Sequence, residues 1–215
     1  EEKIIPAAYM TYWAVPNRLN LRAGMEYEYG ESTDESVGFS AADDEKSRYW
    51  RASPEIGMSY WMMQGKHRLD FLGRYDKGRN DFEDERIRPE EDFQSWLGKA
   101  TWTRVFNRRL KGFVYYEQGR MDYEFGDEAD YELYIPGAGF EYLLREETPV
   151  LMSLGYLIRD QEVGGTETAY LFNGQLRRWR FLQDGYISFT AQSGYEVDNT
   201  GAERLGFGLY YLVNS

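Results

Sequence analysis

The segment NRLNLRAGMEYEYGE, residues 17–31, alternates strictly between two kinds of side chain. Leucine, alanine, methionine and tyrosine occupy every odd position from Leu19 to Tyr29, whereas asparagine, arginine, glycine and glutamate occupy the even positions between them. Successive side chains of a β-strand point to opposite faces of the sheet. One face of this strand is therefore apolar and aromatic, and the other face carries charge of both signs.

The same alternation recurs along most of the chain, and no long window has helical periodicity. We predict about eleven strands, at residues 4–15, 18–31, 47–63, 67–79, 93–106, 109–123, 131–145, 149–161, 167–180, 185–196 and 203–213. Several of them approach or exceed the ~10 residues that a tilted strand needs to cross a membrane. Two stretches, residues 110–119 and 134–144, are less regular because apolar residues occur at both parities.

The connections between these strands alternate in length. The short ones comprise residues 16–18, 64–67, 107–109, 146–149 and 182–185, and longer polar ones begin at Glu31, Asn80, Gly126, Val163 and Val197. Short turns at one end and long loops at the other are typical of outer-membrane barrels, whose turns are periplasmic.

The pattern predicts an all-β fold, an antiparallel up-and-down transmembrane β-barrel of about 11–12 strands. Residues 1–215 then form a single domain in the outer membrane of a Gram-negative bacterium. A soluble β-barrel or sandwich is the alternative, since it would bury the apolar face and expose the charged one. Strand length, the asymmetry of the connections and mid-strand charges of both signs favour the membrane protein.

Composition excludes several classes of protein. The formal net charge of −12 argues against a nucleic-acid partner, because phosphate binding needs a basic face. No cysteine is present, so disulfides, thiolate nucleophiles and sulfur-rich metal sites are excluded. No apolar run approaches the ~18 residues of a membrane helix. The sequence predicts no cofactor, and the predicted partners are outer-membrane lipid and lipopolysaccharide, with another envelope protein chain as a further candidate.

The final segment, SGYEVDNTGAERLGFGLYYLVNS at residues 193–215, pairs a Gly-Tyr strand end with a short acidic loop and an LGF…YY strand. Together with HRLDFLGRYDKGRNDFED at residues 67–84, it resembles outer-membrane β-barrel proteins associated with exopolysaccharide or exosortase-type gene clusters. The resemblance implies a barrel connected with polysaccharide export or cell-surface assembly. It supplies no catalytic residues, and the chain departs from the usual terminal aromatic residue by ending in LVNS.

Strand parity assigns side chains to the two faces of the predicted barrel. The charged residues expected to line the lumen are Arg22, Glu26, Glu28, Arg51, Glu55, Arg68, Asp70, Arg74, Asp76, Lys99, Lys111, Glu117 and Arg177. The residues expected to face lipid are Leu21, Met25, Phe71, Trp102 and Phe189. The inward charges either plug a narrow barrel or line a polar conduit, and the inward aromatics Trp61 and Tyr115 either stack on sugars or fill space.

We predict no enzyme, metal site or catalytic residue. His67 is the sole histidine, and it lies in a short turn on the predicted periplasmic side, away from the long loops. Acidic loop residues could bind Ca²⁺ through carboxylates, but no loop has EF-hand spacing and solvated charge is the simpler interpretation. These residues are Asp43, Asp44, Glu45, Asp81, Glu83, Asp84 and Glu85.

The favoured function is a porin-like conduit for a polar solute, with polysaccharide or small-solute export as its purpose. A non-conducting scaffold barrel of an envelope complex is the alternative, and an outer-membrane hydrolase is a third. With about eleven strands, the first strand starts at the end of the barrel that carries the long loops, and the last one finishes at the end that carries the short turns. Because an odd count cannot close with every neighbour antiparallel, we expect a missing strand or a second chain in the wall.

Overall fold

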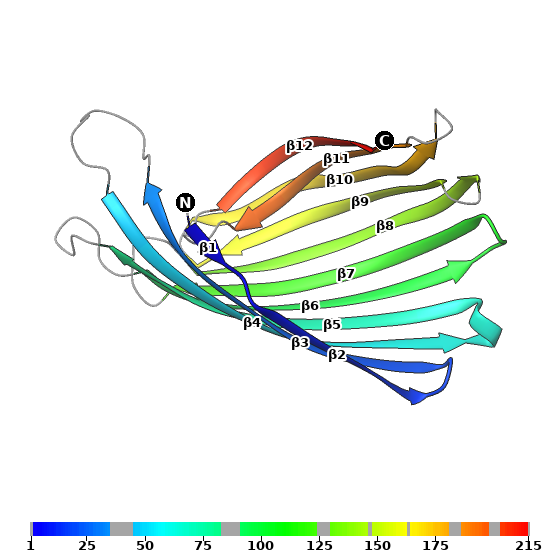
Figure 1. The fold of residues 1–215 in the computed structure, drawn as a ribbon, viewed down its shortest axis with the longest axis horizontal. Coiled ribbons are helices and arrows are strands. Elements are labelled where there is room, and N and C mark those ends of the chain that lie inside the picture. Colours follow the sequence, from blue (N-terminus) through cyan, green and yellow to red (C-terminus); the bar gives the residue numbers. More distant parts are fainter. Residues whose placement is uncertain are drawn as a thin grey trace.

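The computed structural model describes residues 2–34, 45–82, 91–123, 130–145, 148–162, 164–180, 186–197 and 203–214 (Figure 1). Its strands are β1 (Glu2–Ile4), β2 (Ala7–Val15), β3 (Leu19–Asp34), β4 (Glu45–Met62), β5 (His67–Phe82), β6 (Glu91–Val105), β7 (Leu110–Tyr123), β8 (Tyr131–Arg145), β9 (Thr148–Gln161), β10 (Gly165–Arg180), β11 (Tyr186–Val197) and β12 (Glu203–Asn214). One helical turn, the 3₁₀ segment η1 (Met63–Gly65), joins β4 to β5. The described residues contain no helix that is both long and apolar enough to cross a membrane.

All twelve strands belong to one antiparallel sheet, in which each strand from β3 to β12 pairs with the next along the chain. β1 and β2 both pair with β3, because the chain leaves the ladder only at Ile5 and Pro6 between them. A proline lacks the N–H that a ladder needs, which explains the interruption. The sheet therefore has eleven strand positions, and the predicted all-β, up-and-down, antiparallel architecture is confirmed.

The irregular stretches at residues 110–119 and 134–144 are also regular strands, β7 and β8, in unbroken register from Leu110↔Tyr142 to Met121↔Tyr131. Several strands run further than predicted: β3 continues to Asp34, opposite Glu45 of β4. Sequence alternation ends before these polar residues, but backbone hydrogen bonds continue the ladder without any apolar side chain.

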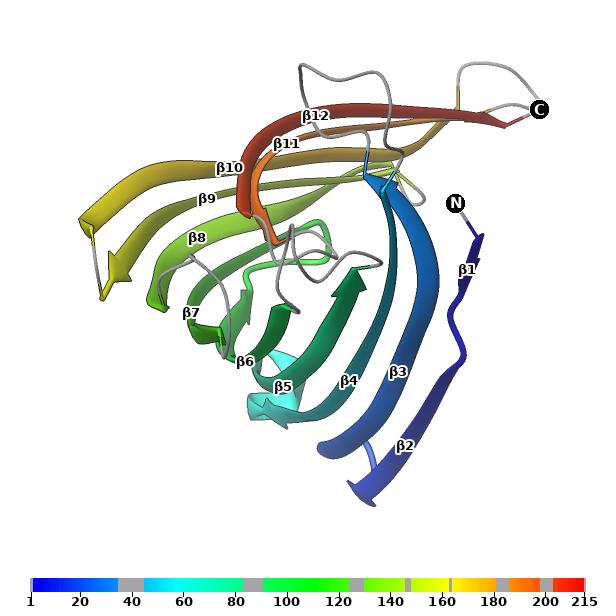
Figure 2. The same cartoon turned by 90° about the vertical axis from the view of Figure 1, so that its left-hand side faces the viewer.

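The sheet curls into a deep trough, with β1 and β2 along one rim and β12 along the other (Figure 2). Among the described residues no pairing joins β12 to β1 or β2, so the trough is open along one side. β1 begins at the end of the sheet that carries the long connections, and β12 finishes at the other end (Figure 1). Whether a further strand or a second chain completes the wall stays a prediction.

Tight turns gather at one end of the strands, which we call the turn end; the opposite end is the loop end. Between β2 and β3 the backbone N–H of Arg18 donates to the carbonyl of Val15 at 3.0 Å. Between β6 and β7 the side-chain oxygen of Asn107 accepts hydrogen bonds from the N–H groups of Arg109 and Leu110, at 2.8 and 2.9 Å. Asparagine favours such turns because its side chain bonds its own backbone.

Candidate functional site: the inner face of the sheet

Side chains of the two strand parities lie on opposite faces of the trough, and Tyr115 identifies the concave one. Its ring lies over Gly137 on β8, and its hydroxyl oxygen reaches Gly155 on β9, two strands away. Residues of this parity, such as Leu133 and Ile135, are buried, whereas those of the other parity, such as Tyr116, are exposed, as expected for a concave and a convex surface. We call this surface the inner face and the convex surface the outer face.

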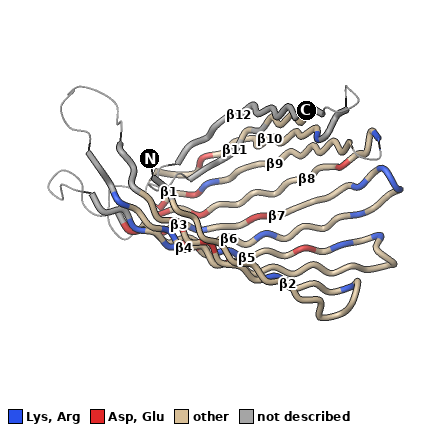
Figure 3. Tube along the Cα trace, viewed as in Figure 1, with Lys and Arg blue, Asp and Glu red and all other residues tan. Residues whose placement is uncertain are grey.

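The thirteen residues predicted to line the lumen all lie on the inner face. The register rows show it: Arg22, Gly57, Leu72, Lys99 and Glu117 stand side by side across five strands. The remaining predicted residues of this face are Glu26, Glu28, Arg51, Glu55, Arg68, Asp70, Arg74, Asp76, Lys111 and Arg177. Figure 3 shows basic and acidic positions interspersed along the strands.

Nine of these residues form what we call the charged strip, on β3, β4 and β5: Arg22, Glu26, Glu28, Arg51, Glu55, Arg68, Asp70, Arg74 and Asp76. Its centre is Asp76, whose side chain is only 6% exposed. Arg51 and Arg74 both approach Asp76 Oδ1, at 3.0 and 2.9 Å, and the hydroxyl of Ser53 donates to the same oxygen at 2.5 Å. Several donors on one buried carboxylate satisfy a charge that would otherwise be costly to bury.

Cross-strand ion pairs continue from this centre over the inner face. The cross-strand pairs are Arg22–Glu55 at 3.2 Å, Lys99–Glu117 at 2.9 Å and Lys111–Glu141 at 2.8 Å, and Arg68 pairs with Asp70 within β5 at 2.7 Å. Glu26 and Glu28 accept hydrogen bonds from tyrosine hydroxyls, those of Tyr9 and Tyr49 respectively. The charged strip holds four basic and five acidic residues, so it has both signs at close spacing instead of a field of one sign.

Beyond the charged strip the inner face also has a buried apolar region. A buried group of six residues, which we call the inner apolar cluster, comes from β6, β7, β8 and β9: Phe93, Met121, Tyr131, Leu133, Ile135 and Leu157. Each of them is at most 9% exposed. Sequence alternation missed this cluster, and it explains why apolar residues occupy both parities of β7 and β8.

The five residues predicted to face lipid lie on the outer face. Their side chains are between 39% and 51% exposed, and they are Leu21, Met25, Phe71, Trp102 and Phe189. Further exposed apolar side chains surround them, among them Ile56, Val114 and Leu154. An exposed apolar surface of this extent needs a lipid or protein covering. That lipid provides it stays a prediction.

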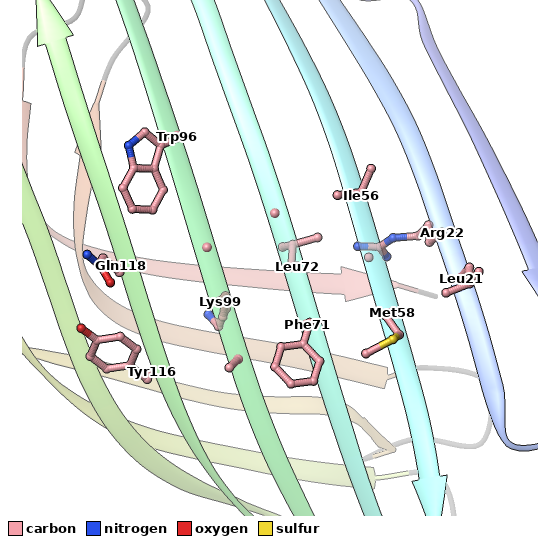
Figure 4. A pocket seen from close by; sticks show the side chains of 14 residues that line it. Leu21, Arg22, Ile56, Met58, Phe71, Leu72, Trp96, Lys99, Tyr116 and Gln118 are labelled. Atoms are coloured by element: carbon pink, nitrogen blue, oxygen red, sulfur yellow. The ribbon is translucent and has the colours of Figure 1, made fainter.

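The outer face also holds a shallow hollow of about 630 Å³ (Figure 4). Trp96, Tyr116 and Phe71 stand on its rim, and Gly73 and Gly98 leave its floor low. A Cβ atom at Gly73 would meet only Ile56 Cγ1, at 3.6 Å, which is an ordinary contact. The hollow is therefore a gap among outer-face side chains, which are mostly apolar.

Two further candidate sites are His67 and the acidic loops. His67 begins β5, and its ring stacks on that of Trp102 with 5.6 Å between centroids and 5° between planes. Asp43, Asp44, Glu83, Asp84 and Glu85 lie outside the described residues, and of Glu45 and Asp81 the backbone alone is described. Within the described part of the chain, histidine, aspartate and glutamate form no group of three arranged to hold a metal ion.

Comparisons with known proteins identify the fold. No protein-family model matches the sequence, and no curated protein is significantly similar to it. Solved structures do match: OmpT, an outer membrane protein of Vibrio cholerae, folded in vitro, has a TM-score of 0.51 and 10% identity over 98% of this chain and 95% of that one. OmpT of Vibrio cholerae expressed in the outer membrane matches with a TM-score of 0.51 and 11% identity, over 97% of this chain and 89% of that one.

A FadL homologue of Pseudomonas aeruginosa also matches, with a TM-score of 0.54 and 10% identity over 97% of this chain and 65% of that one. Identities this low establish the fold alone. The chain therefore has the fold of outer-membrane β-barrel proteins, which agrees with the predicted location in the bacterial outer membrane.

Proposed function

We propose that this chain forms the wall of a polar conduit across the outer membrane. The observation that carries the proposal is the charged strip, in which paired charges of both signs line the concave face of a sheet whose convex face is apolar. Ionised groups are tolerated at membrane depth when they face a water-filled interior and pair with one another. A wall of this kind suits solutes that are polar.

The number of strands, which sets the width of a barrel, also supports a conduit. Barrels of about eight strands are filled by their own side chains, and wider ones leave an aqueous channel. The sheet already has eleven strand positions before any closure. Saccharides are the solutes we favour, in line with the resemblance to barrels associated with exopolysaccharide gene clusters, and export is the favoured direction.

A non-conducting scaffold barrel is the second candidate, because the inner apolar cluster fills part of the concave face. Neither candidate uses catalytic chemistry, and we propose that the protein is not an enzyme. The scaffold would present the loops or turns to other envelope proteins and would pass no ions.

Planar-bilayer recordings of the full natural chain separate these two candidates. A conduit gives discrete conductance steps with little preference between K⁺ and Cl⁻, because the inner-face charges are balanced. In Lys99→Glu the new carboxylate lies beside Glu117, its ion-pair partner at 2.9 Å, so preference for K⁺ should rise.

Lys77→Glu is the matched control, since Lys77 lies on the outer face opposite Ala52 and Gln94 and should leave selectivity unchanged. A correctly folded protein that gives no conductance would remove the conduit and favour the scaffold.

A further inference from the structure

A hollow of about 350 Å³ lies on the inner face, next to the inner apolar cluster. Its lining comes from β6 to β11 and includes Lys99, Phe113, Tyr115, Ile135, Ser153 and Asn173. Hollows of this size that combine an apolar floor with a few polar groups are typical of small-ligand sites. The arrangement of its aromatic and polar groups indicates what kind of ligand fits.

Tyr115 lies flat against the wall because two neighbouring residues are glycines. A Cβ atom at Gly137 would lie 2.2 Å from Tyr115 Cζ, and one at Gly155 would lie 2.6 Å from the Tyr115 hydroxyl oxygen. Real Cβ atoms do not approach other atoms so closely, so side chains at these positions would lift the ring off the sheet. The glycines thus fix the orientation of the ring.

Phe113 lies in the same way over Gly139, where a Cβ atom would come within 2.5 Å of Phe113 Cζ. The centroids of Phe113 and Tyr115 are 6.3 Å apart, with 33° between the ring planes. The two rings together form an aromatic shelf, and we use this name for Phe113 and Tyr115. One side of the shelf rests on glycine backbone and the other side faces the hollow.

Lys99 covers part of the side of the shelf that faces the hollow. The Lys99 ammonium lies over the Tyr115 ring, 5.0 Å from its centroid, and pairs with Glu117 at 2.9 Å. The Lys99 side chain is 38% exposed, so a ring that stacks on Tyr115 would displace the ammonium from over the Tyr115 ring toward the open side of the hollow. A donor from Lys99 and acceptors from Glu117 therefore border the shelf.

Asn173 supplies a further polar group, a side-chain oxygen that lacks a hydrogen-bond donor. Its side-chain oxygen is buried and accepts no hydrogen bond from any described residue. Because the residue lines the hollow, a turn of its amide group would present this oxygen to a ligand hydroxyl and give it the hydrogen bond it lacks. The polar edge of the hollow thus favours a ligand with several hydroxyl groups.

We propose that this hollow binds one ring of an uncharged saccharide, stacked on the aromatic shelf with hydroxyl groups directed at Asn173, Lys99 and Glu117. The inference rests on the proposed conduit, since it names a solute subsite on the conduit wall. A pyranose ring offers an apolar C–H face for the shelf and a rim of donors and acceptors for the polar groups. A simple ion cannot use the shelf, and a long acyl chain leaves the Asn173 oxygen unpaired.

Calorimetric titration of the full natural chain with cellobiose in detergent tests the proposal. Tyr115→Leu removes half of the shelf and should weaken cellobiose binding roughly tenfold. Tyr116→Leu is the matched control, because Tyr116 is the next residue, points to the outer face and is exposed, so binding should be unchanged. Tetraethylene glycol, which has no ring, should not bind to the native protein.

Asn173→Leu separates a ligand-binding role from a structural one. Removing an unpartnered acceptor should leave the urea midpoint unchanged or raise it, while cellobiose binding weakens severalfold. Cellobiose binding that is undetectable in the native protein, or that survives both Tyr115→Leu and Asn173→Leu, would overturn the proposal.

The conduit and the subsite fail in different ways. Conductance steps that cellobiose does not block, combined with no calorimetric binding, would remove the subsite and leave the conduit. Binding with the expected variant pattern in a protein that conducts no ions would retain the subsite and remove the conduit.

Discussion

The inner face of β4 and β5 and the inner face of β7, β8 and β9 line the same trough with opposite chemistry. On β4 and β5 the side chains are charged, and each charge is stabilised by specific partners, as Asp76 is by Arg51 and Arg74. On β7 to β9 the buried side chains are apolar, and burial against one another stabilises them. The stability of the first region depends on the orientation and pairing of its charges. The stability of the second depends on the apolar volume that it buries.

This difference indicates how the two regions respond to substitution. A charge in the strip stabilises the fold only when it is paired. Removing one member of a pair leaves the other charge buried without a partner, which lowers the free energy of unfolding. A residue of the inner apolar cluster contributes in proportion to its buried volume, so small changes have graded effects.

Asp76→Ala should produce the largest loss, because it deprives two guanidiniums of their shared carboxylate. We expect the free energy of unfolding to fall by about 3 kcal/mol, measured by urea titration of the folded barrel in lipid vesicles. The control is Asp122→Ala, which removes the 2.6 Å ion pair between Asp122 and Arg120. Because the Arg120 side chain is 45% exposed, the loss in Asp122→Ala should be far smaller than that in Asp76→Ala. Equal losses in the two variants would contradict a special role for the charged strip.

Gly137→Ala should come next, because the new methyl group collides with the Tyr115 ring that lies over Gly137. Overpacking of this kind costs about 1–3 kcal/mol. Gly73→Ala provides the comparison, since its methyl group would find open space on the outer face, 3.6 Å from Ile56 Cγ1. Urea titration measures both variants, and an equal loss in Gly137→Ala and Gly73→Ala would argue against the flat orientation of the Tyr115 ring.

Ile135→Val tests how tightly the inner apolar cluster is packed. Removing one methylene group from a residue that is 7% exposed should lower the free energy of unfolding by about 0.5–1.5 kcal/mol. The same urea titration measures it, with Ile56→Val on the exposed outer face as the control. A loss in Ile56→Val as large as that in Ile135→Val would show that the inner apolar cluster is no better packed than the outer face.

Lys99→Gln should have the smallest effect on stability. Its ion pair with Glu117 is partly exposed to the interior, so we expect a loss of about 0.2–1 kcal/mol that diminishes as salt concentration rises. A loss that persists in 1 M salt would mean that Lys99 contributes through packing on Tyr115 and not through charge.

The sequence by itself determined most strand positions, the number of strand positions in the sheet and, where the alternation is strict, the face to which each side chain points. These properties follow from an alternation of period two, which is local and survives any change of curvature. Leu21 and Arg22 are adjacent, and their opposite faces were fixed by parity alone. The two kinds of connection were equally local, because they are read from length and composition.

Only the tertiary structure decided which inner-face residues meet. Asp76 is joined to Arg51 by the register between β4 and β5, and Tyr115 finds Gly137 and Gly155 because three strands align. Apolar residues such as Leu133 and Ile135 could have faced either lipid or the interior of a closed sheet. Curvature and register assign them to the concave face, because both depend on contacts between residues far apart in the chain.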